Sequence, residues 1–275
     1  MDSNAFALAS MQGKSVIVTG STQGLGERIA HTFVDRGADK VVICGRNAAN
    51  GAKVKAALEK KGAKVVFIEA DLSKLEDVRK IVPAAEKAFG KVDALVNAAA
   101  LSDRGTIHDT SPELYDKLMN VNVRAPFFLT QDAVNLMVKT KTKGTIVNII
   151  SMSGHGGQSF ISAYSISKGA LLTMTKNTGF SVMRHGIRIN GLCIGWMDTP
   201  GEDRIMKTYH EAKDGWLAEK EAGLPTGRLL KTDEVARACA YLSTDESGLM
   251  TGSIIDFDQA VVGCYEGAPQ PPALA

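Results

Sequence analysis

The sequence has little cysteine. Four cysteines occur in 275 residues, far apart and without a C-x-x-C pair: Cys44, Cys193, Cys239 and Cys264. This pattern argues against a disulfide-stapled fold and predicts reduced, mostly buried thiols, as is usual in a cytoplasmic protein. The five histidines show no ligand spacing either, so the sequence predicts no metal site.

The chain also lacks an excess of either charge. Its 32 basic and 30 acidic residues leave a formal net charge of +2, which gives no reason to expect a nucleic acid or an anionic membrane as a partner. No apolar stretch approaches the roughly 20 residues that a membrane helix needs. Asp2 stands where a signal peptide would carry basic residues, so no such peptide is expected.

What the sequence does contain is a repeated strand–helix order. Short runs rich in valine and isoleucine predict strands at 15–19, 40–44, 64–69, 94–97, 144–151, 187–193 and 253–257. Longer patterns between them predict helices at 25–37, 48–61, 74–89, 112–138, 164–184 and 233–242. The strands are continuously apolar, which is typical of parallel strands buried on both faces. The order predicts an α/β fold with a doubly wound parallel sheet of about seven strands and helices on both faces.

The organisation is that of a single domain. We expect an N-terminal extension at 1–12, one domain over 13–260 and a proline-rich tail at 261–275. Within the domain, residues 196–228 interrupt the alternation with tryptophan, tyrosine, glycine and charge. This length is ordinary for one large α/β domain with a sizeable core.

A glycine turn follows the first predicted strand. Residues 19–26 read T-G-S-T-Q-G-L-G and lead into a helix. Gly20 permits a tight turn, Gly24 lets backbone approach a pyrophosphate, and Gly26 lets the helix pack close to the sheet. The helix N-terminus then offers free N–H groups to phosphate. The alternative is a plain glycine-rich turn, since the spacing is G-x-x-x-G-x-G and not G-x-G-x-x-G.

The end of the second predicted strand indicates which dinucleotide binds. An acid about twenty residues beyond the turn usually holds the ribose of NAD, and an arginine favours the 2′-phosphate of NADP. Here the chain reads V-V-I-C-G-R-N at 41–47, with Arg46 and no carboxylate. We therefore expect NADP, although NAD is not excluded and Arg46 could be a solvated loop charge. Gln23 is neutral and does not decide the matter.

Tyr164 and Lys168 stand four apart, on one face of a predicted helix. A phenol has an unperturbed pKa of about 10, and an ammonium one turn away is expected to lower that pKa. Ser151 closes the preceding strand and can point at the same place. Together they could take a proton from an alcohol while its carbon loses a hydride. Such a pair also arises often by chance on a solvated helix face.

These motifs, in this order, resemble the short-chain dehydrogenase/reductase family over about residues 11 to 260. The resemblance implies a Rossmann-type fold and a catalytic set of Ser151, Tyr164, Lys168 and Asn122. It implies cofactor contacts at Gly20, Thr22, Gln23, Gly24, Leu25, Gly26, Arg46, Asp71, Leu72, Asn97, Tyr164, Lys168 and Thr199. Three sites depart from the family pattern: N-A-A-A at 97–100 replaces N-N-A-G, Ile194 replaces a proline, and Gln259-Ala260 replaces a glycine pair.

The resemblance also implies roles beyond proton transfer. Lys168 would bind the nicotinamide ribose, and Asn122 would hold a water that links Lys168 to solvent, unless it only satisfies backbone groups. Residues 196–228 look like the mobile substrate lid of the family. Family members commonly form homotetramers, and the tail could reach a neighbouring subunit.

The expected substrate is a small polar alcohol or carbonyl. The segment after Ser151 carries hydroxyl, imidazole and amide groups, which suit a substrate with several hydroxyls, and we assign substrate binding to Ser151, Ser153, His155, Gln158, Tyr164 and Trp196. Trp196 could instead anchor the core or lid, and His155 and Gln158 could be solvated. A sugar, sugar acid or polyol is favoured. The alternatives are 3-oxoacyl reduction and, from another class, a regulator that senses the cofactor without turnover.

Overall fold

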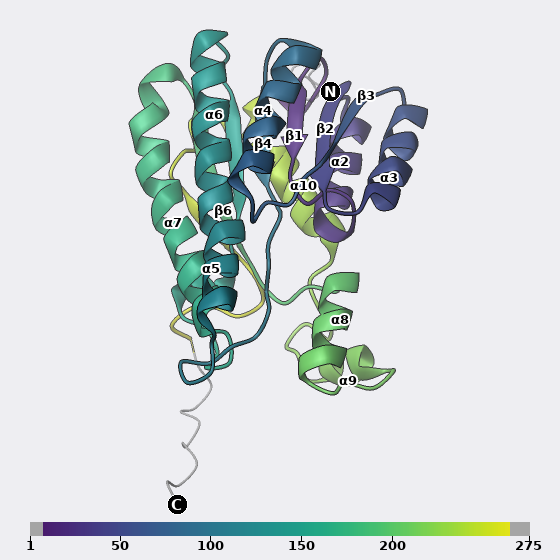
Figure 1. The fold of residues 1–275 in the computed structure, drawn as a ribbon, viewed down its shortest axis with the longest axis vertical. Helices are drawn as coiled ribbons and strands as arrows, with labels where there is room; N and C mark the ends of the chain where they lie inside the picture. The colour runs from purple at the N-terminus through teal and green to yellow at the C-terminus, as the bar shows by residue number, and fades with distance from the viewer. Residues whose placement is uncertain (1–7, 265–275) are drawn as a thin grey trace, which may run out of the picture.

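The computed structural model describes residues 8–264, with a seven-stranded sheet at its centre (Figure 1). All neighbouring strands are parallel, in the order β3-β2-β1-β4-β5-β6-β7. The strands are β1 Ser15–Val18, β2 Lys40–Gly45, β3 Lys64–Glu69, β4 Ala94–Asn97, β5 Thr145–Ile149, β6 Arg188–Ile194 and β7 Ile254–Phe257. The predicted doubly wound α/β sheet is confirmed. Its order reverses between β1 and β4, where sheets of this kind bind ligands.

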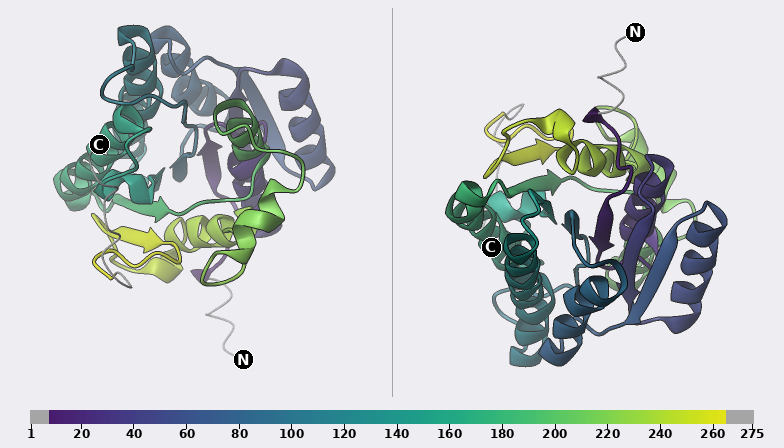
Figure 2. Two further views of the ribbon diagram at one scale, coloured as in Figure 1. Left: turned by 90° about the horizontal axis from the view of Figure 1, so that it is seen from below. Right: turned by 90° about the horizontal axis from the view of Figure 1, so that it is seen from above.

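Helices cover both faces of the sheet, as Figure 2 shows. One face carries α2 (Gly24–Asp35), α3 (Ala48–Lys60) and α10 (Thr232–Leu242), and the other carries α4 (Leu75–Phe89), α6 (Ala125–Lys139) and α7 (Ser162–Val182). Successive strand residues point to opposite faces of the sheet. Val16 and Val18 pack into the core under α2, α3 and α10, and Ile17 packs into the core under α4, α6 and α7. Two buried faces explain why the strands read as continuous apolar runs.

The helix predicted at 112–138 has an irregular centre. It consists of α5 (Pro112–Met119), a π-helical turn η1 (Asn120–Arg124) and α6. The buried side chain of Asn122 lies in this turn and binds backbone groups of Leu101. Such π turns are frequent at functional sites.

The strand predicted at 144–151 is shorter than expected. It ends at Ile149, and Ser151 begins a 3-10 turn, η2 (Met152–His155). Two further 3-10 turns are η3 (Met183–His185) and η4 (Asp245–Ser247). The early end of β5 places the Ser151 hydroxyl at the carboxyl edge of the sheet.

The 196–228 segment contains two helices that the sequence pattern did not predict, α8 (Pro200–Tyr209) and α9 (Trp216–Ala222). Figure 1 shows them beyond the body of the sheet and its covering helices. The Thr199 side chain caps α8, and Pro200 occupies its first position. A small separate core of Met206, Trp216 and Leu229 holds this unit together.

The ends of the predicted domain are only partly described. Residues 1–7 of the expected extension and 265–275 of the expected tail lie outside the described residues. Met11 falls within the expected extension but is fully buried, and its amide donates to the Arg36 carbonyl at 2.9 Å. Among the described helices, none combines the length and the apolar character needed to cross a bilayer.

Candidate active site

The glycine turn has a conformation and a closeness of packing that require glycine. Gly20 and Gly24 both have positive φ, +64° and +57°. A Cβ on Gly26 would lie 2.4 Å from the Gly20 carbonyl oxygen, and one on Gly20 would lie 2.8 Å from Ala99 Cα. A Cβ on Gly24, by contrast, would meet no atom within 4 Å. The turn therefore packs closely against the protein at Gly20 and Gly26, whereas the space next to Gly24 is open.

The N-terminus of α2 is free to receive phosphate. Helix α2 begins at Gly24, and the preceding Gln23 makes no side-chain cap hydrogen bond. The first-turn N–H groups of the helix are therefore not capped by this side chain, and they carry the positive end of the helix dipole. Leu25 and Thr22 are buried at the turn, and Thr22 fills the space that Gly45 leaves empty. The residues present fit a dinucleotide pyrophosphate.

Arg46 and Asp71 stand where the adenosine half would lie. Arg46 is exposed just after β2, and its charge acts on Asp71 after β3. Burial tends to raise the pKa of Asp71, but hydrogen bonds from Ser73 and the charges of Arg46 and Lys74 bring it below its usual value. Leu72 is buried beside it. The structure thus brings together the residues assigned to this end.

Asn97 points away from this cradle. Its side-chain amide donates to Asn148 at 2.8 Å, inside the sheet, and Asn148 donates in turn to Thr175 at 2.9 Å. Asn97 is 2 % exposed. Its side chain therefore links β4 to β5, so any cofactor contact from this position has to come from the neighbouring backbone.

Ser151, Tyr164 and Lys168 meet at the carboxyl end of β5. The Ser151 hydroxyl lies close enough to Tyr164 to lower the pKa of its phenol. The Lys168 ammonium lies 5.7 Å from the centre of the Tyr164 ring and donates to the Ile149 carbonyl at 2.8 Å. Lys168 is 2 % exposed. Helix α7 supplies the tyrosine and the lysine one turn apart, as the i, i+4 spacing predicted.

The electrostatics of this pair differ from the expectation. Burial raises the pKa of Tyr164 above its usual value, and Ser151 offsets this only in part. Burial also lowers the pKa of Lys168 to about 8. The prediction that Lys168 holds the pKa of Tyr164 below its ordinary value is wrong for this structure. The ammonium is bound by the Ile149 carbonyl, and desolvation outweighs the remaining influences.

Both polar atoms of the Asn122 side chain are hydrogen-bonded to other groups of the protein. Its side-chain oxygen accepts from the Leu101 amide at 2.8 Å, and its nitrogen donates to the Leu101 carbonyl at 2.9 Å and to Ser167 at 3.0 Å. These bonds tie the loop after β4 to η1 and α7. The side chain thus has the backbone-satisfying role that the sequence left open. A role in holding water stays a prediction.

Trp196 takes part in the internal contacts of the 196–228 segment. Its indole N–H donates to Glu202 at 2.8 Å, and its ring stacks on Trp216 with centroids 5.9 Å apart. The Trp216 N–H donates to Asp203 at 2.9 Å. Thr199 accepts a hydrogen bond from the Glu202 amide at 3.1 Å. These contacts favour the interpretation of Trp196 as a lid anchor over a sugar-stacking surface.

Arg104 and Glu202 are the site residues that sequence reasoning missed. Their side chains form an ion pair at 3.7 Å and are only 16 % and 17 % exposed. Both charges act on Tyr164: Glu202 raises its pKa and Arg104 lowers it. Arg104 comes from the loop after β4 and Glu202 from α8, so the pair joins the body of the domain to the 196–228 segment. No local motif marks either residue, because the fold alone brings them together.

The other residues assigned to substrate binding differ in how close they lie to the Ser151 and Tyr164 hydroxyls. Ser153 is hydrogen-bonded to Ser151, with the two hydroxyl oxygens 3.2 Å apart. Gln158 is exposed. His155 is hydrogen-bonded to Asp256 of β7 at 2.7 Å. Only Ser153 therefore lies directly beside the reacting hydroxyls.

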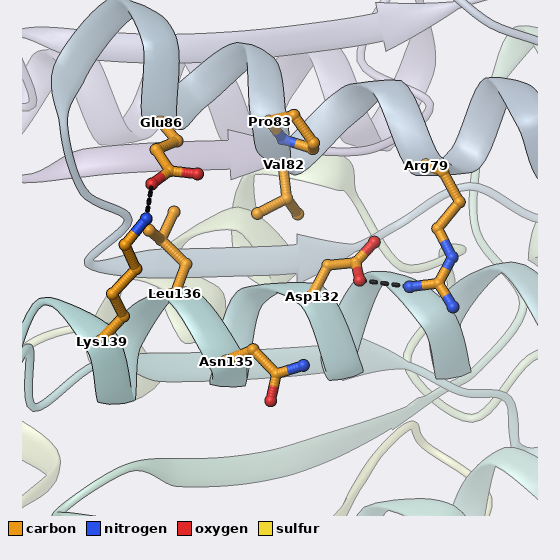
Figure 3. A pocket seen from close by; sticks show the side chains of 8 residues that line it. All are labelled: Arg79, Val82, Pro83, Glu86, Asp132, Asn135, Leu136 and Lys139. Atoms are coloured by element: carbon orange, nitrogen blue, oxygen red, sulfur yellow. Dashed lines mark hydrogen bonds and ion pairs between the residues drawn. The ribbon is translucent and has the colours of Figure 1, made fainter.

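A surface groove between α4 and α6 is distinct from this site. Figure 3 shows its lining, where Arg79 pairs with Asp132 and Lys139 with Glu86. The groove is lined by residues of α4 and α6, on one face of the sheet, and its lining includes neither the glycine turn nor Tyr164. Its charges neutralise one another, so it presents no surplus charge to an ionic ligand.

Comparison with known proteins identifies relatives that match most of the chain. A family model described as enoyl-(acyl carrier protein) reductase matches residues 20–260. A Thermotoga maritima protein named only as an oxidoreductase is 36 % identical over 234 residues, which are 85 % of this chain and 91 % of the relative. Gluconate 5-dehydrogenase of Gluconobacter oxydans is 32 % identical, with coverage of 86 % and 90 %. A solved short-chain type dehydrogenase/reductase from Mycobacterium marinum superimposes with a TM-score of 0.82 at 27 % identity, covering 91 % of this chain and 96 % of that one.

Proposed function

We propose, from the premise that this chain belongs to the short-chain dehydrogenase/reductase family, that it oxidises a secondary alcohol of a sugar, sugar acid or polyol. As a member of that family the chain is an NAD(P)-dependent oxidoreductase acting on CH–OH groups. The observation that carries the proposal is the convergence of Ser151, Tyr164 and Lys168 at the carboxyl edge of the sheet, where the Lys168 ammonium lies 5.7 Å from the Tyr164 ring and Ser151 acts on the phenol.

The proposed catalytic set handles one proton. Tyr164, as phenolate, accepts the proton of the substrate hydroxyl, and Ser151 donates a hydrogen bond to the carbonyl oxygen that forms. When bound, the oxidised nicotinamide supplies the hydride acceptor and a positive charge beside the phenol. Arg104 adds positive charge that favours the phenolate. Lys168 would also hold the nicotinamide ribose, and Thr199 the carboxamide.

NADP is the proposed cofactor. The exposed Arg46 guanidinium, just beyond β2, can grip a 2′-phosphate with two parallel hydrogen bonds. The ratio of kcat/KM for NADP to that for NAD measures this preference. A strong preference for NAD would contradict the role given to Arg46.

The polar wall beside Tyr164 supports a hydroxyl-rich substrate. Arg104, Glu202 and Ser153 offer donors and acceptors close to the reacting hydroxyls. The relative from Gluconobacter oxydans acts on gluconate, a sugar acid. The description of the matching family model favours reduction of an acyl substrate as a second candidate, but the mostly buried, charged Arg104–Glu202 pair is a poor surface for an apolar acyl chain.

A screen of aldoses, sugar acids, polyols and 3-oxoacyl thioesters with both cofactors tests this function. We expect turnover, read by absorbance of reduced nicotinamide, with a polyhydroxylated substrate. Tyr164→Phe should abolish it and leave NADP affinity within about threefold, because the phenol oxygen is not part of the phosphate cradle. Cofactor binding without turnover across the whole panel would support a cofactor-sensing regulator instead.

Three wider assignments complete the proposal. The chain is one domain over 13–260, in which 196–228 act as a substrate lid. Its cysteine pattern supports a cytoplasmic location. A homotetramer is supported by the apolar side chains exposed on α6 and α7, such as Phe127 and Phe180.

A further inference from the structure

Three side chains meet at the edge of the sheet, and the proposed proton transfer uses none of them. They are His155 in η2, Cys193 in β6 and Asp256 in β7, and one potential ligand atom from each lies within 4.8 Å of the others. Strand register explains part of this, because Cys193 and Asp256 are direct partners across β6 and β7. The 3-10 turn after Ser151 brings His155 to the same place, 2.7 Å from Asp256.

The three groups are already organised around one carboxylate. Asp256 is hydrogen-bonded to the imidazole Nε2 of His155, and the Cys193 sulfur lies within 4.8 Å of the same carboxylate. The thiol is completely buried, whereas the His155 and Asp256 side chains are 29 % and 41 % exposed. A cation could thus approach from solvent and meet a preformed set with the sulfur at its base.

The donor chemistry selects the kind of cation. A thiolate, an imidazole nitrogen and a carboxylate oxygen are the three ligand types that Zn²⁺ accepts, and three protein ligands plus water make an open tetrahedral site. Magnesium and calcium prefer all-oxygen sets. We propose that His155, Cys193 and Asp256 form a binding site for Zn²⁺ or a chemically similar divalent transition metal.

Binding changes only the proton balance of the site. The metal–sulfur bond forms as the Cys193 thiol loses its proton to solvent. The imidazole binds as the neutral tautomer with its remaining proton on Nδ1, so that the hydrogen bond between His155 Nε2 and Asp256 is replaced by metal–ligand bonds. No electron is transferred. The ammonium of Lys168, one of the active-site residues, is an opposing charge that acts on Cys193. The carboxylate of Asp258, two residues after Asp256 and beside Gly195, adds negative charge in compensation.

This site was not visible in the sequence because its ligands come from three separate elements. The three residues are far apart in the sequence, and the intervals between His155, Cys193 and Asp256 match no known metal-ligand spacing. The site lies outside the residues assigned to the proposed proton transfer, and it does not depend on which substrate is turned over.

Cobalt and zinc titrations of the full-length, metal-free protein test the proposal. Co²⁺ bound through a thiolate gives a sulfur-to-metal charge-transfer absorption, which oxygen and nitrogen ligands do not give. We expect this band at about one equivalent per chain, its loss on adding Zn²⁺, and its absence from Cys193→Ser. Cys264→Ser is the matched control, because Cys264 is the exposed cysteine and its loss should leave the band unchanged.

Cys193 is buried, so the Cys193→Ser variant could misfold. A second variant therefore tests the proposal independently. Asp256→Asn removes one ligand at the partly exposed edge and should weaken Zn²⁺ binding at least tenfold, with an unchanged circular dichroism spectrum. A thiolate band that persists in Cys193→Ser, or that disappears in Cys264→Ser, would overturn the assignment. Equal Zn²⁺ affinity in wild type and Asp256→Asn, or no Co²⁺ binding by folded wild-type protein, would do the same.

Discussion

The positive charge of Lys168 lies in the protein interior, where water does not solvate it. Its ammonium is buried, and the Ile149 carbonyl is the neighbour to which it donates, at 2.8 Å. Burial lowers its pKa to about 8 from a usual value of 10.5. Below that pH the folded protein carries a buried charge that the unfolded chain keeps in water. The residue that the proposed chemistry needs is therefore one that costs stability at neutral pH.

This cost should be visible as a pH dependence of stability. Between pH 8 and 10.5 the unfolded chain binds the Lys168 proton more tightly than the folded protein, so stability rises with pH in that window. Relative to Lys168→Met, which cannot titrate, wild type should gain about 2 kcal/mol in unfolding free energy from pH 7 to 9.5. Urea unfolding of both proteins at equal concentration measures this. A pH-independent difference between them would contradict the burial of a charged lysine.

Arg104 and Glu202 act on Tyr164 in opposite directions, which allows a paired test. Arg104 lowers the pKa of Tyr164 and Glu202 raises it. The kcat/KM profile for alcohol oxidation depends on phenolate, so Arg104→Gln should move its rise to higher pH, and Glu202→Gln should move it to lower pH. Arg104→Gln should also raise KM about tenfold by removing a charged donor.

The pH–rate profile separates an electrostatic role from a purely structural one. Loss of the ion pair alone would loosen the lid in both variants and shift both profiles the same way. Arg228→Gln serves as a control, because this arginine also pairs with a carboxylate near the lid, that of Glu234. Its profile should coincide with that of wild type. Parallel shifts of the two test variants would remove Arg104 and Glu202 from the proposed electrostatics.

Individual elements were predictable where burial and local geometry agree. The strands β3 and β4 have the predicted bounds, because both faces of the sheet are covered and the apolar runs end where burial ends. The glycine turn was predictable because a positive φ and a close approach leave few other residues possible. Tyr164 and Lys168 needed only the helical period.

The lid could not be predicted in the same way. Helix α8 has a polar sequence with two buried apolar residues, Ile205 and Met206, of which Met206 belongs to a small separate cluster. What fixes the lid is a set of indole–carboxylate hydrogen bonds and the stacking of Trp196 on Trp216. These contacts join residues up to twenty positions apart with no repeating period. The Arg104–Glu202 pair escaped prediction for the same reason.

The two tryptophans make the lid observable. The chain contains two tryptophans, and both, Trp196 and Trp216, lie in the lid. Intrinsic tryptophan fluorescence therefore reports on this element alone. Because the lid core is small and separate from the two large cores, we expect it to open before the sheet unfolds. In urea, the fluorescence transition should have a lower midpoint than the far-ultraviolet circular dichroism transition.

A control for this prediction uses the cofactor and substrate together. If 196–228 close over the substrate, the ternary complex should move the fluorescence midpoint toward that of the circular dichroism, and NADP alone should do so less. Coincident midpoints in the free protein would mean that the lid and the sheet unfold as one unit. The lid would then be too firmly attached to act as a moving cover.

At the scale of the whole molecule, one helical layer is unusually apolar on its outside. Ile166, Phe180 and Met183 on and after α7 are 52 %, 77 % and 50 % exposed, and Phe127 on α6 is 44 % exposed. Ile166 and Phe180 are four helical turns apart and share one face of α7. Exposed apolar surface of this extent, on two neighbouring helices, is typical of a protein–protein interface.

A single charge should disrupt an interface of that kind. In a two-fold symmetric pairing of α6 and α7, Phe180 is buried twice, so each pair of subunits gains about 4 kcal/mol from this residue alone. Phe180→Glu should turn the proposed tetramer into dimers at micromolar concentration, because two carboxylates would be desolvated in the contact. Size-exclusion chromatography with light scattering measures the mass. Ile107→Glu, at an equally exposed apolar residue on the loop before α5, should stay tetrameric; a tetramer in both variants would place the interface on another face.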